Sequence, residues 1–227
     1  MVECMHWRIA LRARQAERAR TLPPGILTIA PQLRHESMPA EVALLLPTNE
    51  GPKGLIDAVA EEPALGAGAM LGLFLASPFL NLEVEGRRLA QAGVEWIVNL
   101  PSIEQQDEEF TQQLADVGLD RARELDGLTQ LRDQGFKIAV TVADGGGAAA
   151  AGAIAADSMI VLPRVGDFAA GFPSPRQRGA AAQAVAEAAA EAGWSGPILG
   201  LAEPSDAEHE ALWPEALDGL VCRPAPA

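Results

Sequence analysis

The sequence predicts an α/β fold, a closed (β/α)8 barrel of the TIM type in which strands and helices alternate. Eight apolar runs of strand length recur along the 227 residues, and segments with helical periodicity separate most of them. The runs are nearly continuous rather than alternating, as is typical of strands buried on both faces. Eight runs favour closure, because an open doubly wound sheet more often has about five or six strands. The predicted strands are Ile26–Ala30, Val42–Leu46, Ala69–Ala76, Trp96–Leu100, Phe136–Ala143, Ser158–Leu162, Ile198–Ala202 and Gly219–Cys222.

The segments between these runs carry the patterns of surface helices. Apolar residues recur three or four positions apart, as Phe110 and Leu114 do, and charged residues fill the positions between them. Alternation of such helices with buried strands indicates a parallel sheet. The predicted helices are 81–92, 105–117, 119–134 and 176–192.

The N-terminal part departs from this pattern. Only Pro31–Glu41 separates the first two predicted strands, which is close to the minimum for a parallel crossover with its helix. Either the first strand–helix unit is abbreviated, or the two runs belong to one unit that carries an extra hairpin. In the second case the barrel is incomplete, or a neighbouring chain completes it. We predict one domain over 1–227, with a helix and lead-in over 1–24 and a flexible tail over 223–227.

The composition of the chain excludes several kinds of binding partner and cellular location. A net charge of −14 opposes binding to nucleic acid or to an anionic membrane. The two cysteines, Cys4 and Cys222, have no metal-ligand spacing and indicate free thiols in a reducing compartment. No apolar run reaches the roughly 18 residues of a membrane span. These observations predict a soluble, cytoplasmic protein.

In a parallel barrel the functional residues lie where the strands end and in the loops that follow. Arg164 and Arg223 follow two predicted strands and offer forked donors to a carboxylate or phosphate. Glu50, Asp144 and Glu203 follow three others. Carboxylates that converge there could bind Mg²⁺, for which Glu50 and Asp144 are the candidates, or transfer protons. The competing interpretation is that each carboxylate is simply solvated.

Two further features have structural alternatives. Asp144-Gly145-Gly146-Gly147 stands between a strand and a helix, where backbone amides could bind an anion, or where Asp144 could only cap the helix. The loop lacks the Walker and dinucleotide-binding patterns. The histidines, His6, His35 and His209, lie away from the predicted strand ends, and we expect them to be exposed to solvent.

The segment from Gly93 to Ala143 resembles a bacterial family of TIM-barrel proteins described as phosphoenolpyruvate hydrolase-like, related to the phosphoenolpyruvate mutase/isocitrate lyase group. The motif Val98-Asn99-Leu100-Pro101-Ser102 carries the resemblance, which continues through Asp107, Phe110, Leu114, Gly118 and Glu124. The resemblance implies that Asn99 and Ser102 orient a substrate; alternatively, they only organise the turn.

The chain departs from the family at several strand ends. Glu104 replaces a glycine, Asp120-Arg121 replaces a Gly-Tyr pair, and Pro163-Arg164 stands near the expected position of a histidine. The glycine-rich first strand of the family has no counterpart. These departures suggest a changed ligand or a lost reaction.

Two hypotheses follow. In the first, the chain is a lyase or hydrolase for a small 2-oxo acid or phosphoenolpyruvate-like anion: Glu50, Asp144 and Glu203 are catalytic, and Asn99, Ser102, Arg164 and Arg223 bind substrate. In the second, it is a catalytically inactive barrel that binds a metabolite or a protein partner, with scattered polar groups and a blocked barrel mouth. The irregular N-terminal part also suggests a homo-oligomer, since an exposed strand edge needs cover.

Overall fold

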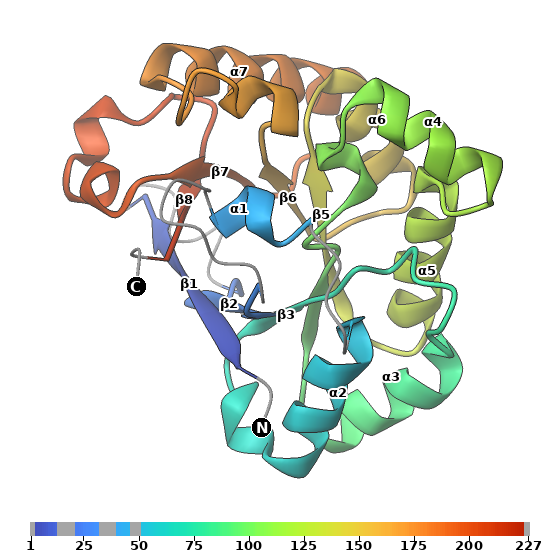
Figure 1. The fold of residues 1–227 in the computed structure, drawn as a ribbon. Coiled ribbons are helices and arrows are strands. Elements are labelled where there is room, and N and C mark those ends of the chain that lie inside the picture. Colours follow the sequence, from blue (N-terminus) through green and yellow to red (C-terminus); the bar gives the residue numbers. More distant parts are fainter. Residues whose placement is uncertain (1–2, 13–20, 32–39, 46–50, 225–227) are drawn as a thin grey trace.

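Eight strands form a closed barrel in the computed structural model, with helices around most of its outside (Figure 1). The structure describes residues 3–12, 21–31, 40–45 and 51–224. Each strand pairs with its neighbours in sequence, and the last pairs with the first, so the barrel closes within one chain. The strands are β1 Cys4–Leu11, β2 Gly25–Ile29, β3 Met70–Gly72, β4 Trp96–Val98, β5 Lys137–Val142, β6 Ser158–Val161, β7 Ile198–Ala202 and β8 Gly219–Cys222.

Six α-helices pack outside the barrel or follow its strands, and the four predicted helices are confirmed with slightly different ends. Carboxylate, amide or hydroxyl side chains cap the first turns of five helices, for example Asp144 on the amide of Gly147 at 2.9 Å. Short 3-10 helices occupy the remaining connections. The helices are α2 Gly51–Glu61, α3 Leu82–Gln91, α4 Glu108–Asp116, α5 Arg121–Asp133, α6 Gly145–Ala153 and α7 Pro175–Glu191; the 3-10 helices are η2 Pro63–Leu65, η3 Ile103–Gln105, η4 Val165–Phe168, η5 Pro204–Glu208 and η6 Glu210–Leu212.

The core has two layers, as a closed barrel requires. The inner layer receives a buried side chain from each of the eight strands, including Trp7, Met70 and Trp96. The outer layer lies between the strands and the helices, where residues such as Leu55, Leu128 and Val185 are fully buried. Because both faces of the parallel strands are covered, these strands are apolar throughout, and this is why seven of the eight predicted strands are confirmed.

The prediction of an N-terminal helix is wrong, because residues 4–11 form β1, which runs antiparallel to both β2 and β8. The sequence of β1 alternates: Trp7 and Ile9 are buried in the barrel, whereas His6 and Arg8 are exposed on its outer side. One face of this strand meets solvent, so it lacks the continuous apolar run by which the other strands were found. The possibility of an incomplete barrel is also wrong, since β1 closes the gap.

The predicted strand Val42–Leu46 is wrong as well. Residues Ala40–Ala43 form a short helix, α1, and Leu46 lies outside the described residues. Leu44, which follows α1, is 3% exposed and packs against the inner core layer. Figure 1 shows α1 in front of the barrel opening. The segment is apolar because it covers the barrel mouth and not because it joins the sheet.

The connection from β7 to β8 contains η5 and η6 but no α-helix. This part of the barrel wall therefore lacks the helical cover that the other parallel strands have. None of the described helices is long and apolar enough to cross a membrane.

Candidate functional site

Strands β2 to β8 are parallel, so their carboxyl ends meet at one rim of the barrel. Six of the seven predicted site residues lie among the described residues near this rim. Glu50 lies outside them. The structure distributes the six over three groups rather than one pocket.

Asn99 and Ser102 belong to a buried group that we call the wall network, which consists of Asn99, Ser102 and Glu124. Asn99 follows β4 on the outer side of the barrel wall, and its Nδ2 donates to Ser102 Oγ at 3.0 Å and to Glu124 Oε2 at 3.3 Å. Ser102 Oγ donates to Glu124 Oε2 at 2.7 Å. Asn99 Oδ1 accepts from the amide of Thr141 in β5 at 2.8 Å. The network thus joins β4, β5 and α5.

Glu124 is the centre of the wall network and has no exposed surface. Burial raises its pKa to about 7, although the hydrogen bonds from Ser102, Ile103 and Asn99 oppose this shift. Both of its carboxylate oxygens accept hydrogen bonds, including those from the amide of Ile103 at 3.2 Å. This carboxyl group faces the barrel wall and packs away from any of the cavities described below.

Asp144 and Arg164 belong to a second group, the rim cluster, which consists of Glu104, Arg121, Asp144 and Arg164. Arg164 Nη2 lies 2.6 Å from Asp144 Oδ2 and 3.7 Å from Glu104 Oε1. Arg121, at the start of α5, forms an ion pair with Glu104 Oε2 and donates to the carbonyl of Gly147 at 3.1 Å. The four side chains come from loops that follow β4, β5 and β6 and from α5. With all four groups ionised their charges cancel.

Glu104 is the unusual member of the rim cluster. Its side chain is 5% exposed, and its buried Oε1 has no hydrogen-bond partner. Burial raises the pKa of Glu104; Arg121, Arg164 and a hydrogen bond from the backbone of Ala143 oppose the shift, whereas Asp144 adds to it. Glu104, Arg121 and Arg164 together line a cavity of about 220 Å³ that α4 borders on its other side. A buried carboxyl group with an unused oxygen beside a cavity can exchange a proton with a bound molecule.

Glu203 and Arg223 belong to a third group, the mouth cluster, with Glu41 of α1 and Phe172. Arg223 Nη1 lies 3.2 Å from Glu203 Oε1 and 3.5 Å from Glu41 Oε1, and its guanidinium carbon is 4.8 Å from the centre of the Phe172 ring. Glu41 is 1% exposed, its Oε2 has no hydrogen-bond partner, and burial raises its pKa. Leu44, Phe168 and Phe172 pack against the inner core here, so apolar side chains fill this part of the mouth.

Asp144 opens the glycine-rich loop and is the one of the two expected Mg²⁺ ligands that the structure describes. Asp144 caps α6 through Oδ1 and pairs with Arg164 through Oδ2, so both of its oxygens are engaged. Among the described residues, no three His, Cys, Asp or Glu side chains are grouped as a metal site would need. His6 and His209 are exposed, as expected, and His35 lies outside the described residues. Among the described residues, Cys4 and Cys222 form no disulfide, and burial raises the pKa of both thiols.

Sequence reasoning did not place Glu41, Glu104, Arg121 or Glu124 in a site. For two of them a signal was present: Glu104 and Arg121 are both positions where the chain departs from the family that it resembles, and the structure pairs them with each other. Glu41 carried no such signal, because its segment was predicted as a strand.

Comparisons with known proteins support the fold. No family model and no curated protein matches the sequence. FabK from Thermotoga maritima is similar in structure, with a TM-score of 0.50 and 11% identity over 92% of this chain and 60% of that chain. A mutant of FabK from Thermotoga maritima has a TM-score of 0.45 and 12% identity over 75% of this chain and 48% of that chain. Nitroalkane oxidase from Streptomyces ansochromogenes has a TM-score of 0.40 and 13% identity over 75% of this chain and 54% of that chain.

These similarities bear on architecture only. The chain spans about 60% of the length of the FabK chain with which it has a TM-score of 0.50. At this identity the likeness establishes a TIM-barrel fold and says nothing about substrate. The closed barrel and the FabK comparison together place the chain among the TIM-barrel proteins.

Proposed function

We propose that this chain is a TIM-barrel enzyme of the lyase or hydrolase type that acts on a small 2-oxo acid or phosphoenolpyruvate-like anion at the rim cluster. One observation carries the proposal: the buried Oε1 of Glu104 has no hydrogen-bond partner, and the two oxygens of its carboxylate form ion pairs with Arg121 and Arg164 beside a cavity at the strand ends. Resemblance to the phosphoenolpyruvate hydrolase-like family supports the substrate class.

The charges of the rim cluster favour binding of an anion together with uptake of a proton by the cluster. Arg164 is 40% exposed on its side chain and can turn part of its guanidinium toward a ligand carboxylate or phosphate. A bound anion makes the cluster net negative if Glu104 stays ionised. Protonation of Glu104, whose pKa burial already raises, removes one of the negative charges. In the proposed reaction Glu104 therefore holds the proton that the substrate accepts or gives back.

The other predicted residues take supporting roles in this proposal. Asn99 and Ser102 act as positioning residues, because the wall network holds the backbone of the loop that carries Glu104: the amide of Glu104 donates to Ser102 Oγ at 3.1 Å. Asp144 orients Arg164. Binding of Mg²⁺ by Glu50 and Asp144, and roles for Glu203 and Arg223, remain predictions, as does a homo-oligomer, which light scattering after size exclusion would test.

A second candidate function rests on the mouth of the barrel. Leu44, Phe168 and Phe172 pack against the inner core where a barrel enzyme usually receives its substrate. A filled mouth supports a catalytically inactive barrel that binds a metabolite at its rim. The two candidates share the anion and differ in turnover.

Calorimetric titration and thermal shifts with phosphoenolpyruvate and oxaloacetate, each with and without Mg²⁺, test the proposal. We expect binding that is weakened in Arg164→Ala and kept in Arg87→Ala, a surface arginine on α3. Binding with product formation supports the enzyme. Binding without turnover supports the inactive barrel, and no binding of either anion contradicts both.

A further inference from the structure

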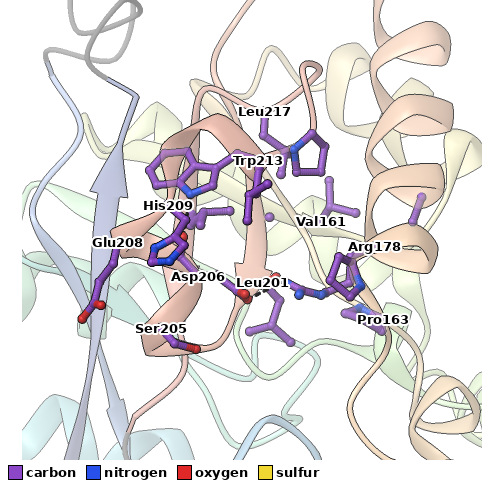
Figure 2. Close-up of a pocket in the computed structure, with 16 residues that line it drawn as sticks. Val161, Pro163, Arg178, Leu201, Ser205, Asp206, Glu208, His209, Trp213 and Leu217 are labelled. Atoms are coloured by element: carbon purple, nitrogen blue, oxygen red, sulfur yellow. Dashed lines mark hydrogen bonds and ion pairs between the residues drawn. The ribbon is translucent and has the colours of Figure 1, made fainter.

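A larger cavity lies on the opposite flank of the rim, between α7 and the outer face of β7 and β8. Its volume is about 470 Å³, within the usual range of small-molecule sites. Figure 2 shows Trp213 and Leu217 on one side of it and Arg178 and Val161 on the other. None of the residues of the rim cluster lines it.

The cavity exists because of the unusual β7–β8 connection. The 3-10 helices η5 and η6 form one wall of the cavity but do not fill the space against the strands. Ala182, Val185 and Ala189 of α7 are buried against the barrel, whereas Pro175, Arg178 and Ala181, in the first part of the helix, line the cavity.

The open space is local and does not reflect a loose core. Leu217 lies so close to Gly200 in β7 that a Cβ on this glycine would be 2.6 Å from Leu217 Cδ1. Buried Leu217 and Leu220, which belong to the outer core layer, form the floor. Protein interiors are normally packed to crystal-like density, so a cavity of this size with a well-packed floor is a feature of the fold.

The chemistry of the lining defines what could bind. Most of the lining is apolar, and it includes the indole of Trp213, over which Arg12 lies at 5.6 Å from the ring centre. Arg178, whose side chain is 13% exposed, forms an ion pair with Asp206 at 2.9 Å. Nε and Nη1 of Arg178 donate to the carbonyls of Pro173 and Leu201, both at 3.0 Å. A charged ligand would lose its hydration here without gaining a counter-charge.

We propose that this cavity between α7 and the β7–β8 wall is a binding site for an uncharged, mainly apolar small molecule that carries one hydrogen-bonding group. The apolar body lies against Trp213 and Leu217. Ser205 and His209, which are exposed at the side of the cavity where Figure 2 shows them, meet the polar group. The ligand is thus opposite in character to the anion proposed for the rim cluster.

N-phenyl-1-naphthylamine, an uncharged dye that fluoresces in apolar surroundings, tests the site. We expect saturable binding at one site per chain. Ala181→Leu places a larger side chain in the cavity, so we expect at least about tenfold weaker dye binding together with a higher thermal midpoint, because the variant fills a void. Ala180→Leu, one position away on the exposed side of α7, should bind the dye as the unchanged protein does.

A second variant covers the case in which Ala181→Leu does not fold. Leu212 lines the cavity but is 76% exposed, so Leu212→Glu leaves the core intact and puts a charge at the entrance. We expect dye affinity to fall by about threefold or more. Unchanged affinity in both variants, or a fluorescence increase that never saturates, would overturn the proposal.

Phosphoenolpyruvate separates this site from the rim cluster. Saturating phosphoenolpyruvate should leave dye binding unchanged, and Ala181→Leu should keep its thermal shift with phosphoenolpyruvate. Displacement of the dye by the anion would place the dye at the rim cluster and refute a separate apolar site. Loss of the anion's effect alone would contradict only the proposed function.

Discussion

The wall network and the rim cluster are formed by residues of the same two segments, but the buried carboxylates of the two groups differ in their hydrogen bonding. Ser102 and Glu104 are two residues apart after β4, and Arg121 and Glu124 are three apart on α5. Glu124 has hydrogen bonds on both oxygens and lies inside the wall. Glu104 has an unused oxygen and lies beside a cavity. Complete pairing indicates a structural role, and incomplete pairing beside open space indicates a ligand site.

The largest expected effect comes from breaking the wall network. Asn99→Ala removes a donor to Glu124 and the acceptor of the Thr141 amide, both buried. We expect the free energy of unfolding in urea at pH 8 to fall by about 3 to 4 kcal/mol. The control is Asn81→Ala, which removes the exposed cap of α3 and should cost about 1 kcal/mol. Equal losses in the two variants would show that the network contributes no more than a surface cap.

A change of pH is expected to alter the free energy of unfolding by a nearly equal amount. The pKa of Glu124 is raised from 4.5 to about 7 in the folded chain, so between these values the folded state binds this proton more tightly than the unfolded state. The free energy of unfolding therefore decreases as pH rises through this window, by about 3 kcal/mol from this group. Urea titrations from pH 4 to pH 8 measure it.

The variant Glu124→Gln isolates this contribution, because its side chain stays neutral at every pH. We expect a weaker decrease of stability with rising pH and a variant that is more stable than the unchanged protein at pH 8. If the two proteins show the same pH dependence, Glu124 titrates normally and the proposed effect of burial is wrong.

A smaller effect, on binding rather than stability, is expected at the rim cluster. Arg164→Ala should weaken phosphoenolpyruvate binding by about tenfold, because a charge-assisted pair to the anion is lost. Its exposed side chain should change the free energy of unfolding by less than about 1 kcal/mol. Arg87→Ala removes an exposed i,i+4 partner of Glu83 and should alter neither quantity. Equal affinity in both variants would place the anion elsewhere.

The smallest expected effect is the uptake of protons when the anion binds. Because anion binding favours protonated Glu104, binding should take up at most about one proton and should tighten as pH falls. Calorimetry in buffers of different ionisation enthalpy measures this uptake. In Glu104→Gln the uptake should disappear, whereas Asp107→Asn, an exposed cap of α4, should keep it. Uptake that persists in Glu104→Gln would assign the proton to another group.

The sequence predicted those strands that are buried on both faces and missed the strand that is buried on one face. Strands such as β5 and β7 are apolar throughout and were predicted with nearly correct ends. β1 was missed because His6 and Arg8 interrupt its apolar residues. Leu44 suggested a strand although it covers the mouth, because apolar character reports burial and not the kind of element that is buried.

The candidate site was predicted only as a set of residues near strand ends. Asp144 with Arg164 and Glu203 with Arg223 do meet, because neighbouring parallel strands bring their following residues together. That these pairs form separate clusters, and that Asn99 faces α5, depends on strand register and on the direction of each side chain. Neither can be read from spacing along the chain.

The sequence by itself determined seven parallel strands and the alternation of helices with them, since burial leaves a periodic trace along the chain. Its total of eight strands included one wrong strand, Val42–Leu46, and omitted β1. Only the tertiary structure decided that β1 enters antiparallel, that α1 covers the mouth, and that Glu104 lies between Arg121 and Arg164. These features join residues far apart in sequence, and a side chain's partner is fixed by the position of the element that carries it.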